Sequence, residues 1–295
     1  MPSRTWRPTS ALDVGAVLGP LRRGPGDPTF TAADGVWLTA RTPSGPGTLH
    51  VRRADEVLAE AWGPGAEWLL DGLPALLGAD DDDSAFVAHH PLIERTRRAR
   101  PGLRLGATGR VWDVLLPAVL EQKVTSTEAH RSWAQLCHRF GATAPGNDRM
   151  RVPPTPEAVL SITDWEWHRA GVDGARRRTL IAAARVAHRL EAAVGLKGEA
   201  GRALLRKVPG IGVWTAAEVA QRAWADPDAV SFGDFHLAAL VGFALLGKRI
   251  DDAGMAEELA VYAPQRHRAV RYVEASGFRK PRFAPRFSPR DYRAM

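Results

Sequence analysis

Short runs in which apolar and polar residues alternate mark the first 78 residues of the chain. Three segments carry the pattern: residues 30–32, 36–41 and 48–53. Turn-forming residues separate them, namely Ala33-Asp34-Gly35 and the Pro- and Gly-rich loop at 42–47. Alternation of this kind is typical of half-buried strands, so the region predicts a small antiparallel sheet. Residues 55–61 and 67–77 are expected to be short helices packed against it, and the acidic run 80–83 a solvated hinge.

From residue 84 onward the apolar residues recur at helical spacing. Residues 111–140 contain apolar positions three and four residues apart, which indicates buried helix faces. Thr125 stands three residues before Glu128, the spacing of a capping box, so a second helix is expected to begin there. A polar, Pro-rich loop is expected at 143–156. Further helices are expected at 156–162, 164–170, 175–194, 199–207, 213–224 and 237–246.

The two patterns together predict an α+β fold, in which a small antiparallel β-rich domain precedes an all-α core. The expected boundaries are 1–83 for the β-rich domain, 84–278 for the helical core and 279–295 for a basic, irregular tail. A chain of 295 residues has ample length for two such domains. No repeat occurs at the periods of solenoid proteins.

Composition excludes several classes of function. The longest apolar stretches, such as 237–246, are far shorter than the about 20 residues of a membrane span. The N-terminus lacks the features of a secretory signal, so a cytoplasmic protein without membrane partners is expected. Cys137 is the single cysteine, which rules out an internal disulfide or a thiolate cluster. The histidines show no metal-binding spacing, and no catalytic metal is expected.

The net positive charge of the chain comes from its C-terminal end. The formal net charge is +7, and residues 266–295 alone hold nine basic and two acidic groups. The preceding residues are therefore balanced. The basic end is either an arm that binds phosphate groups or a solubilising tail, and the charge count favours neither.

The segment LLRKVPGIG at 204–212, followed by a helix, is the most informative part of the sequence. Gly210 and Gly212 permit a sharp turn between two helices. The N–H groups at the start of the second helix can hold a phosphate of a DNA backbone, and the carbonyl groups of the turn can hold a monovalent cation. An ordinary helical hairpin with a glycine stop is an equal alternative.

An acidic residue follows that hairpin. Asp234 comes after an apolar stretch and Gly233, and it precedes the apolar helix expected at 237–246. In the simpler interpretation Asp234 caps that helix. A fixed carboxylate beside a DNA-binding hairpin is also what cleavage of an N-glycosidic bond requires, because it stabilises the oxocarbenium-like sugar.

These motifs resemble the helix-hairpin-helix DNA glycosylase superfamily, in particular its DNA-3-methyladenine glycosylase II branch. The resemblance rests on VPGIGVWTA at 208–216, on the seventeen residues after it, and on Asp234 with His236. Looser similarity extends over residues 100–105, 111–141, 170–185 and 262–268, and over the β-rich first 78 residues. It implies that the backbone of DNA is bound at Val208, Gly210, Gly212, Val213 and Thr215, and that Asp234 is catalytic.

The resemblance also bears on mechanism. Bifunctional members of the superfamily form a Schiff base through a lysine of the second hairpin helix, and Trp214 stands at that position here. A monofunctional enzyme without lyase activity is therefore implied, in which Asp234 also orients or deprotonates a water molecule. The four-cysteine iron–sulfur loop of another branch is absent, and no cofactor is implied beyond the cation at the hairpin.

Aromatic faces suit a flipped, electron-poor base. Four residues are expected to line the base pocket: Trp112, Trp214, Phe235 and Tyr272, with Trp6 as a weaker candidate. Core packing is the alternative for each, least so for Trp214. The family's wedge residue, which fills the gap left by the base, corresponds to Lys123 after Gln122. A lysine fills a base stack poorly, and a surface lysine is an equal interpretation. His236 either assists Asp234 or binds a backbone group.

Three functions remain open at this point. The leading hypothesis is a monofunctional glycosylase that removes alkylated purines from duplex DNA, acting as a monomer on the nucleoid. The second is a damage-binding protein that retains the hairpin without catalysis. The third is a glycosylase for oxidised or deaminated bases.

Overall fold

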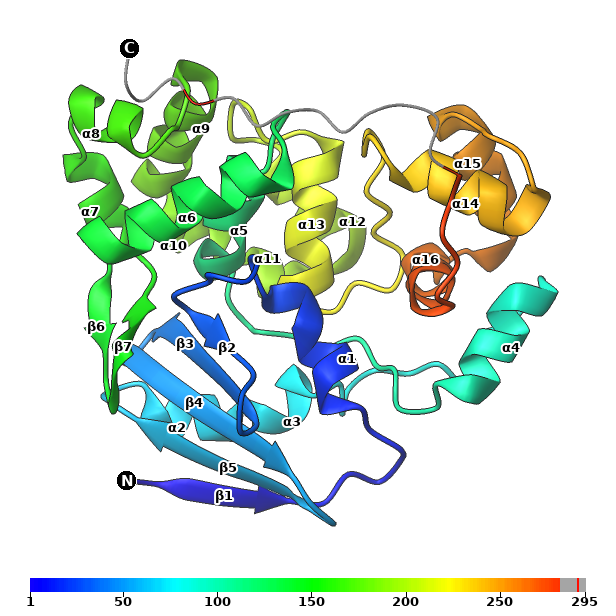
Figure 1. Cartoon of the computed structure of the whole chain (residues 1–295), viewed down its shortest axis with the longest axis horizontal. Coiled ribbons are helices and arrows are strands. Elements are labelled where there is room, and N and C mark those ends of the chain that lie inside the picture. Colours follow the sequence, from blue (N-terminus) through cyan, green and yellow to red (C-terminus); the bar gives the residue numbers. More distant parts are fainter. Residues whose placement is uncertain (282–290, 292–295) are drawn as a thin grey trace.

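The computed structural model describes residues 1–281 and residue 291. Figure 1 shows a small sheet beneath a larger helical part. Most of the predicted basic tail, residues 282–290 and 292–295, lies outside the described residues. Its irregular structure therefore stays a prediction, as do the three domain boundaries.

The sheet has five antiparallel strands in the order β1-β5-β4-β3-β2. Their bounds are β1 Ser3–Trp6, β2 Phe30–Thr31, β3 Val36–Thr42, β4 Gly45–Arg53 and β5 Val57–Trp62. The predicted strands are confirmed, whereas the helix expected at 55–61 is wrong because this segment is strand β5. Val57, Ala59 and Ala61 are buried while Leu58 and Glu60 are not, the two-residue period of a strand at a sheet surface.

Short helices cover the sheet, and the helices and strands share one hydrophobic core. The helices are α1 Val14–Leu18, η1 Gly19–Leu21, α2 Ala66–Asp71 and α3 Leu73–Leu76. Leu49 and Val51 of β4 are completely buried against this layer. The expected helix at 67–77 is thus two helices, which meet at Gly72 with Pro74 in the first turn of α3.

The helical part contains the remaining elements. They are α4 Pro91–Ala99, α5 Trp112–Leu120, α6 Ser126–Phe140, β6 Ala142–Ala144, β7 Asn147–Val152, α7 Pro156–Ser161, α8 Asp164–Arg169, α9 Gly174–Arg185, α10 Ala187–Leu190, α11 Ala193–Leu196, α12 Gly198–Leu205, α13 Val213–Ala223, α14 Leu237–Leu246, α15 Asp252–Leu259, η2 Ala260–Tyr262 and α16 Arg266–Ala275. The capping box of Thr125 and Glu128 is confirmed at the start of α6. The loop expected at 143–156 is instead largely the hairpin β6–β7, which turns at Gly146 with φ +73°. No helix within the described residues is long and apolar enough to cross a membrane.

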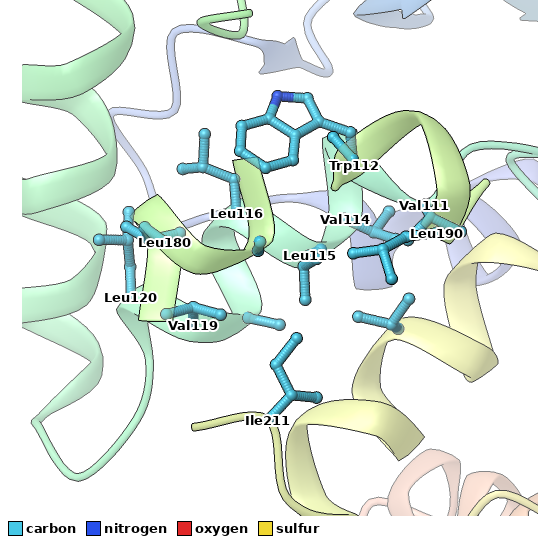
Figure 2. Packing of buried hydrophobic residues seen from close by; sticks show 14 of the residues in the cluster. Val111, Trp112, Val114, Leu115, Leu116, Val119, Leu120, Leu180, Leu190 and Ile211 are labelled. Atoms are coloured by element: carbon cyan, nitrogen blue, oxygen red, sulfur yellow. The ribbon is translucent and has the colours of Figure 1, made fainter. Parts of the chain in front are cut away.

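Helix α5 is the centre of the main helical core. All nine of its residues are buried, and they pack against α6, α9 and α13. Figure 2 shows Leu115 of α5 directed toward Ile211, which belongs to the turn between α12 and α13. The hairpin is therefore anchored in the core through an apolar residue of its own turn.

Two residues of the acidic run at 80–83, Asp81 and Asp83, are part of the packed structure, whereas Asp80 and Asp82 are exposed as expected for a solvated segment. The side chain of Asp81 is 3% exposed and pairs with Arg268 of α16, whose side chain is 1% exposed. Asp83 binds Arg97 and Arg104. Paired charges can be buried, whereas unpaired ones cannot, and a net charge count along the sequence does not show the pairing.

Candidate nucleic-acid interface and catalytic site

The turn between α12 and α13 has a backbone that requires glycine at one position. Gly210 has φ +89°, and a Cβ atom there would lie 2.0 Å from Oγ1 of Thr179 on α9. Gly212, the residue before α13, has an extended backbone and no side chain that could cap the helix. The first N–H groups of α13 therefore lie at a glycine-bordered, exposed helix N-terminus, which is the geometry that binds phosphate.

Gln122 connects this turn to the loop between α5 and α6. Its Nε2 donates to the carbonyl oxygen of Gly210 at 3.0 Å and to Oγ1 of Thr215 at 2.8 Å. The next residue, Lys123, is exposed and has φ +54°, a backbone conformation that a lysine rarely adopts. The structure thus places Gln122 beside the predicted DNA-binding turn, and the predicted wedge residue Lys123 follows it in the same loop.

The carbonyl groups of the turn are the expected ligands of the monovalent cation. The oxygen of Gly210 accepts from Gln122, and the oxygen of Val208 accepts from the N–H of Ile211 at 3.0 Å. Each oxygen retains a second lone pair, so the cation stays a prediction. Among the described residues, no group of three or more His, Cys, Asp or Glu is arranged to hold a metal ion.

Asp234 lies half-buried between α13 and α14. Its Oδ1 accepts from the N–H groups of His236 at 2.7 Å and Leu237 at 2.9 Å, so this oxygen stabilises the start of α14. Its Oδ2 accepts from Nε1 of Trp214 at 3.3 Å. One oxygen is therefore fixed by the backbone while the other is directed toward the hairpin helix.

A lysine that the sequence analysis did not single out lies beside Asp234. Nζ of Lys280 is 3.1 Å from Nδ1 of His236 and 3.4 Å from its carbonyl oxygen. Burial lowers the pKa of Lys280, and the charge of Asp234 partly opposes this shift. The charge count placed Lys280 in the basic tail, but only the fold brings it back to the start of α14.

The aromatic pocket expected from the sequence is not assembled. Trp112 is 5% exposed in the core around α5, where its Nε1 donates to the carbonyl oxygen of Pro154 at 2.9 Å. Figure 2 shows its ring above Leu116 in that core. Tyr272 is 2% exposed and contacts Phe86, with ring centroids 5.5 Å apart. Both rings serve core packing, so their assignment to the base pocket is corrected.

The other aromatic candidates differ in their positions. Trp214 is half-buried, and its hydrogen bond to Asp234 places it at the carboxylate. Phe235 is 74% exposed, with its ring edge against His236 at 4.9 Å. Trp6 lies in edge strand β1 and packs on the core of the sheet.

A second carboxylate, that of Glu218 on α13, also faces the loop that carries Asp234. Oε1 of Glu218 accepts from Oγ of Ser231 at 2.5 Å, and its Oε2 accepts from Arg222 at 2.8 Å. Gln221 donates to the same Ser231 hydroxyl at 2.8 Å. The sequence signal for Glu218 was its position four residues after Trp214, which places both on one side of the helix.

No protein-family model matches the chain. It is 29% identical over 164 residues to the "Probable bifunctional transcriptional activator/DNA repair enzyme AlkA" of Mycobacterium tuberculosis. That match covers 55% of this chain and 31% of the relative, so the chain spans less than a third of the relative's length.

Similar solved structures cover nearly the whole chain. The 3-methyladenine DNA-glycosylase from Archaeoglobus fulgidus has a TM-score of 0.75 and 16% identity, over 92% of this chain and 97% of that one. The 8-oxoguanine glycosylase/lyase from Clostridium acetobutylicum, without DNA, has a TM-score of 0.73 and 11% identity, over 94% and 97%. At these identities the similarity concerns the fold, and it includes the sheet as well as the helices.

Proposed function

Because the chain has the fold of the helix-hairpin-helix DNA glycosylases, we propose that it is a monofunctional DNA glycosylase that removes alkylated purines of the 3-methyladenine type from duplex DNA. The observation that carries the proposal is the position of Asp234. Its carboxylate is half-buried, held by the N–H groups at the start of α14, and hydrogen-bonded to Trp214 of the hairpin helix. We further propose that the protein acts as a monomer on nucleoid DNA in the cytoplasm.

The proposed reaction uses the hairpin to hold the DNA and Asp234 to assist bond cleavage. The N–H groups at the start of α13 bind a backbone phosphate, which positions the everted nucleotide next to Trp214. As the N-glycosidic bond breaks, positive charge builds on the sugar, and Oδ2 of Asp234 stabilises it. Asp234 also orients or deprotonates the water that adds to C1′, leaving an abasic site and a free base.

Lys280 brings a positive charge to this site, and His236 lies beside it. They lie at the start of α14, next to the carboxylate. We assign them to binding the phosphates that flank the everted nucleotide. This leaves Asp234 as the anion closest to the sugar.

The residue that supports the proposed absence of lyase activity is Trp214. Its indole nitrogen is a hydrogen-bond donor only and cannot form a Schiff base. The similarity to an 8-oxoguanine glycosylase/lyase favours a second candidate, a glycosylase for oxidised purines that also cuts the strand. The two candidates differ in their products, because a lyase cuts the abasic strand without alkali.

Base release by an Asp234→Asn variant tests the proposal. We expect the single-turnover rate on a 7-methylguanine duplex to fall by at least about 100-fold, the loss typical of removing one group that stabilises transition-state charge. Affinity for a duplex with an abasic-site analogue should change by less than about threefold, since a uniform loss would indicate unfolding. Asp148→Asn, at an exposed position of β7, is the matched control.

The outcomes separate the alternatives. Full activity of Asp234→Asn would remove Asp234 from the mechanism. If the unaltered chain binds damaged duplex but releases no base, the protein is a damage-binding protein. Product strands that are cut before alkali treatment would contradict the monofunctional assignment.

A further inference from the structure

Helix α9 is fixed against two parts of the proposed DNA-binding face. Thr179 lies next to the hairpin turn, because a Cβ atom at Gly210 would be 2.0 Å from its Oγ1. The buried side chain of Arg176 donates from Nη1 to the carbonyl oxygen of Leu120 at 2.8 Å. Helix α5 ends at that residue, and the loop 121–125 begins there. Helix α9 is therefore held beside both the turn and this loop.

One side of α9 carries arginine side chains at the surface. The residues of this side line a single hollow: Gly174, Arg177, Arg178, Ile181, Ala182 and Arg185. Their spacing of three and four residues is that of one helix side. Arg178 and Arg185 are exposed and seven residues apart, which is about 10 Å along the helix. We name Arg177, Arg178 and Arg185 together the basic face of α9.

The positive charge of the basic face is not neutralised by acidic residues of the same segment. Residues 174–190 contain five arginines and no aspartate or glutamate. Arg177 pairs with Asp164 of α8, whereas Arg178 and Arg185 form no ion pair with any residue that the structure describes. Each of these two guanidinium groups presents five N–H donors and a permanent charge. Both are therefore available to an anionic partner.

The position of the basic face favours duplex DNA as that partner. Phosphates follow one another along a strand at an axial rise of about 3.4 Å, so groups about 10 Å apart match phosphates about three steps apart. A guanidinium group binds a phosphate through two parallel N–H groups. In Figure 1, α13 lies between α9 and α14. A duplex held at the hairpin turn therefore reaches α9 on the side of the hairpin away from Asp234.

We infer that the basic face of α9 is a second DNA-binding surface, which holds phosphates of the duplex that flanks the everted nucleotide. This inference rests on the proposed function and extends it from the damaged nucleotide to the flanking DNA. Helix α9 and Asp234 lie on different sides of the hairpin helix α13. Arg178 and Arg185 therefore contribute to the binding of DNA and not to the cleavage of the N-glycosidic bond.

The salt dependence of binding to an undamaged duplex tests this surface. For Arg178→Gln/Arg185→Gln we expect the loss of affinity with rising salt to be less steep by about 1.8 in the log–log slope, about 0.9 for each lost phosphate contact. Between about 50 mM and about 200 mM salt, the affinity of the variant should fall by a factor about 12 times smaller than that of the unaltered chain. The single-turnover rate at a saturating 7-methylguanine duplex should stay within about twofold.

Arg95→Gln/Arg100→Gln is the matched control. It removes the same charge from exposed positions in and directly after α4, which Figure 1 shows on the other side of the molecule from α9. Because counterion release requires contact with phosphate, the control should keep the slope of the unaltered chain. An unchanged slope in the α9 variant would overturn the inference, and so would an equal change in the control.

Duplexes that extend in one direction only from 7-methylguanine provide a second measurement. The basic face lies on one side of the hairpin, so the α9 variant should lose affinity on one of the two duplexes and keep it on the other. Equal losses on both would overturn the inference and leave the proposed function intact, because base release is measured separately. Release of no base by the unaltered chain would overturn the proposed function, while the slopes on undamaged duplex would still decide whether α9 binds DNA.

Discussion

Asp234 uses its two carboxylate oxygens in different ways, and this determines how a substitution there acts. Oδ1 accepts two backbone N–H groups at the start of α14, a structural contact of the kind that contributes about 1 kcal/mol. An asparagine preserves that acceptor and removes the negative charge. The Asn variant therefore separates the chemical contribution of Asp234 from its contribution to helix stability, which an alanine variant would not do.

Buried His267 makes the stability of the protein depend on pH. Burial, together with the charges of Arg271, Arg222 and Arg268, lowers its pKa well below the ordinary value. In the unfolded chain the pKa of His267 is about 6.5. Below that pH the unfolded state therefore binds a proton that the folded state does not. The stabilising contribution is present above about pH 7 and is lost as the pH falls. Its slope is at most about 1.4 kcal/mol per pH unit.

Urea unfolding of His267→Gln between pH 7.5 and pH 5 measures this contribution. We expect the decrease in unfolding free energy toward low pH to be smaller in the variant than in the unaltered chain. His188→Gln, at an exposed position on α10, should retain the full decrease. Identical slopes in the unaltered chain and His267→Gln would contradict the prediction.

Residue patterns predicted a carboxylate beside the hairpin, and the hydrogen bond from Trp214 to Asp234 places the two residues together. The patterns placed Trp112 wrongly, although a signal was available. Apart from Asp113, residues 112–120 are apolar on all sides of helix α5, and a helix of that kind is buried. Tyr272 gave no such signal, because its surroundings come from residues 86–103 and 230–262, far away in the sequence.

At the scale of elements, the hairpin turn depends on its contact with α9. At Gly210 a side chain would meet Oγ1 of Thr179, and φ +89° strains any residue other than glycine. We expect Gly210→Ala to lower the free energy of unfolding by about 1–3 kcal/mol. It should also weaken binding to duplex DNA, because Gln122 holds the carbonyl oxygen of the same residue.

Urea unfolding and a DNA-binding titration check both effects. Gly212→Ala is the matched control for stability, since its φ of −94° is ordinary and no atom lies within 4 Å of the added Cβ. Equal stability of the two variants would show that the contact with Thr179 does not restrain the turn.

The elements that sequence patterns predicted best are those with a complete local signal. Helix α6 begins at a capping box, and α14 coincides with an apolar run bounded by Asp234 and Gly247. Strand β5 lacks such a signal because the apolar residues Leu58 and Trp62 stand at outward positions and obscure the alternation, and its identity depends on pairing with β4 and β1. The helix expected at 175–194 is α9, α10 and the beginning of α11, and the breaks near Val186 and Glu191 occur without glycine or proline.

In the whole molecule, buried polar contacts connect the sheet region to the helices. Asp81 pairs with Arg268, and Arg222 binds the carbonyl oxygen of Pro20. The partners are 187 and 202 positions apart in the chain, so no sequence pattern predicts them. The contact of Arg222 with Pro20 also holds the N-terminal part against α13, the second helix of the hairpin.

Charge in the whole molecule is asymmetric, and this predicts how DNA affinity depends on salt. Residues 279–295 contain six basic residues and one acidic residue, while residues 1–265 are balanced. Lys280, the second of the six, lies at Asp234 and His236, so the basic end starts at the proposed site. Log affinity falls as log salt rises. Deletion of residues 279–295 should make this decrease less steep, by about 0.9 in slope for each phosphate that the segment neutralises.

A variant of unchanged length separates the charge of the basic end from its bulk. Replacing the six basic residues by glutamine should make the salt dependence less steep by as much as the deletion does, because counterion release depends on charge alone. Titrations of an undamaged duplex from about 50 mM to about 200 mM salt measure both variants, since phosphate contacts change the affinity strongly over this range. An unchanged slope in both would show that the basic end does not contact DNA, and the phosphate contacts would then belong to the hairpin and Lys123.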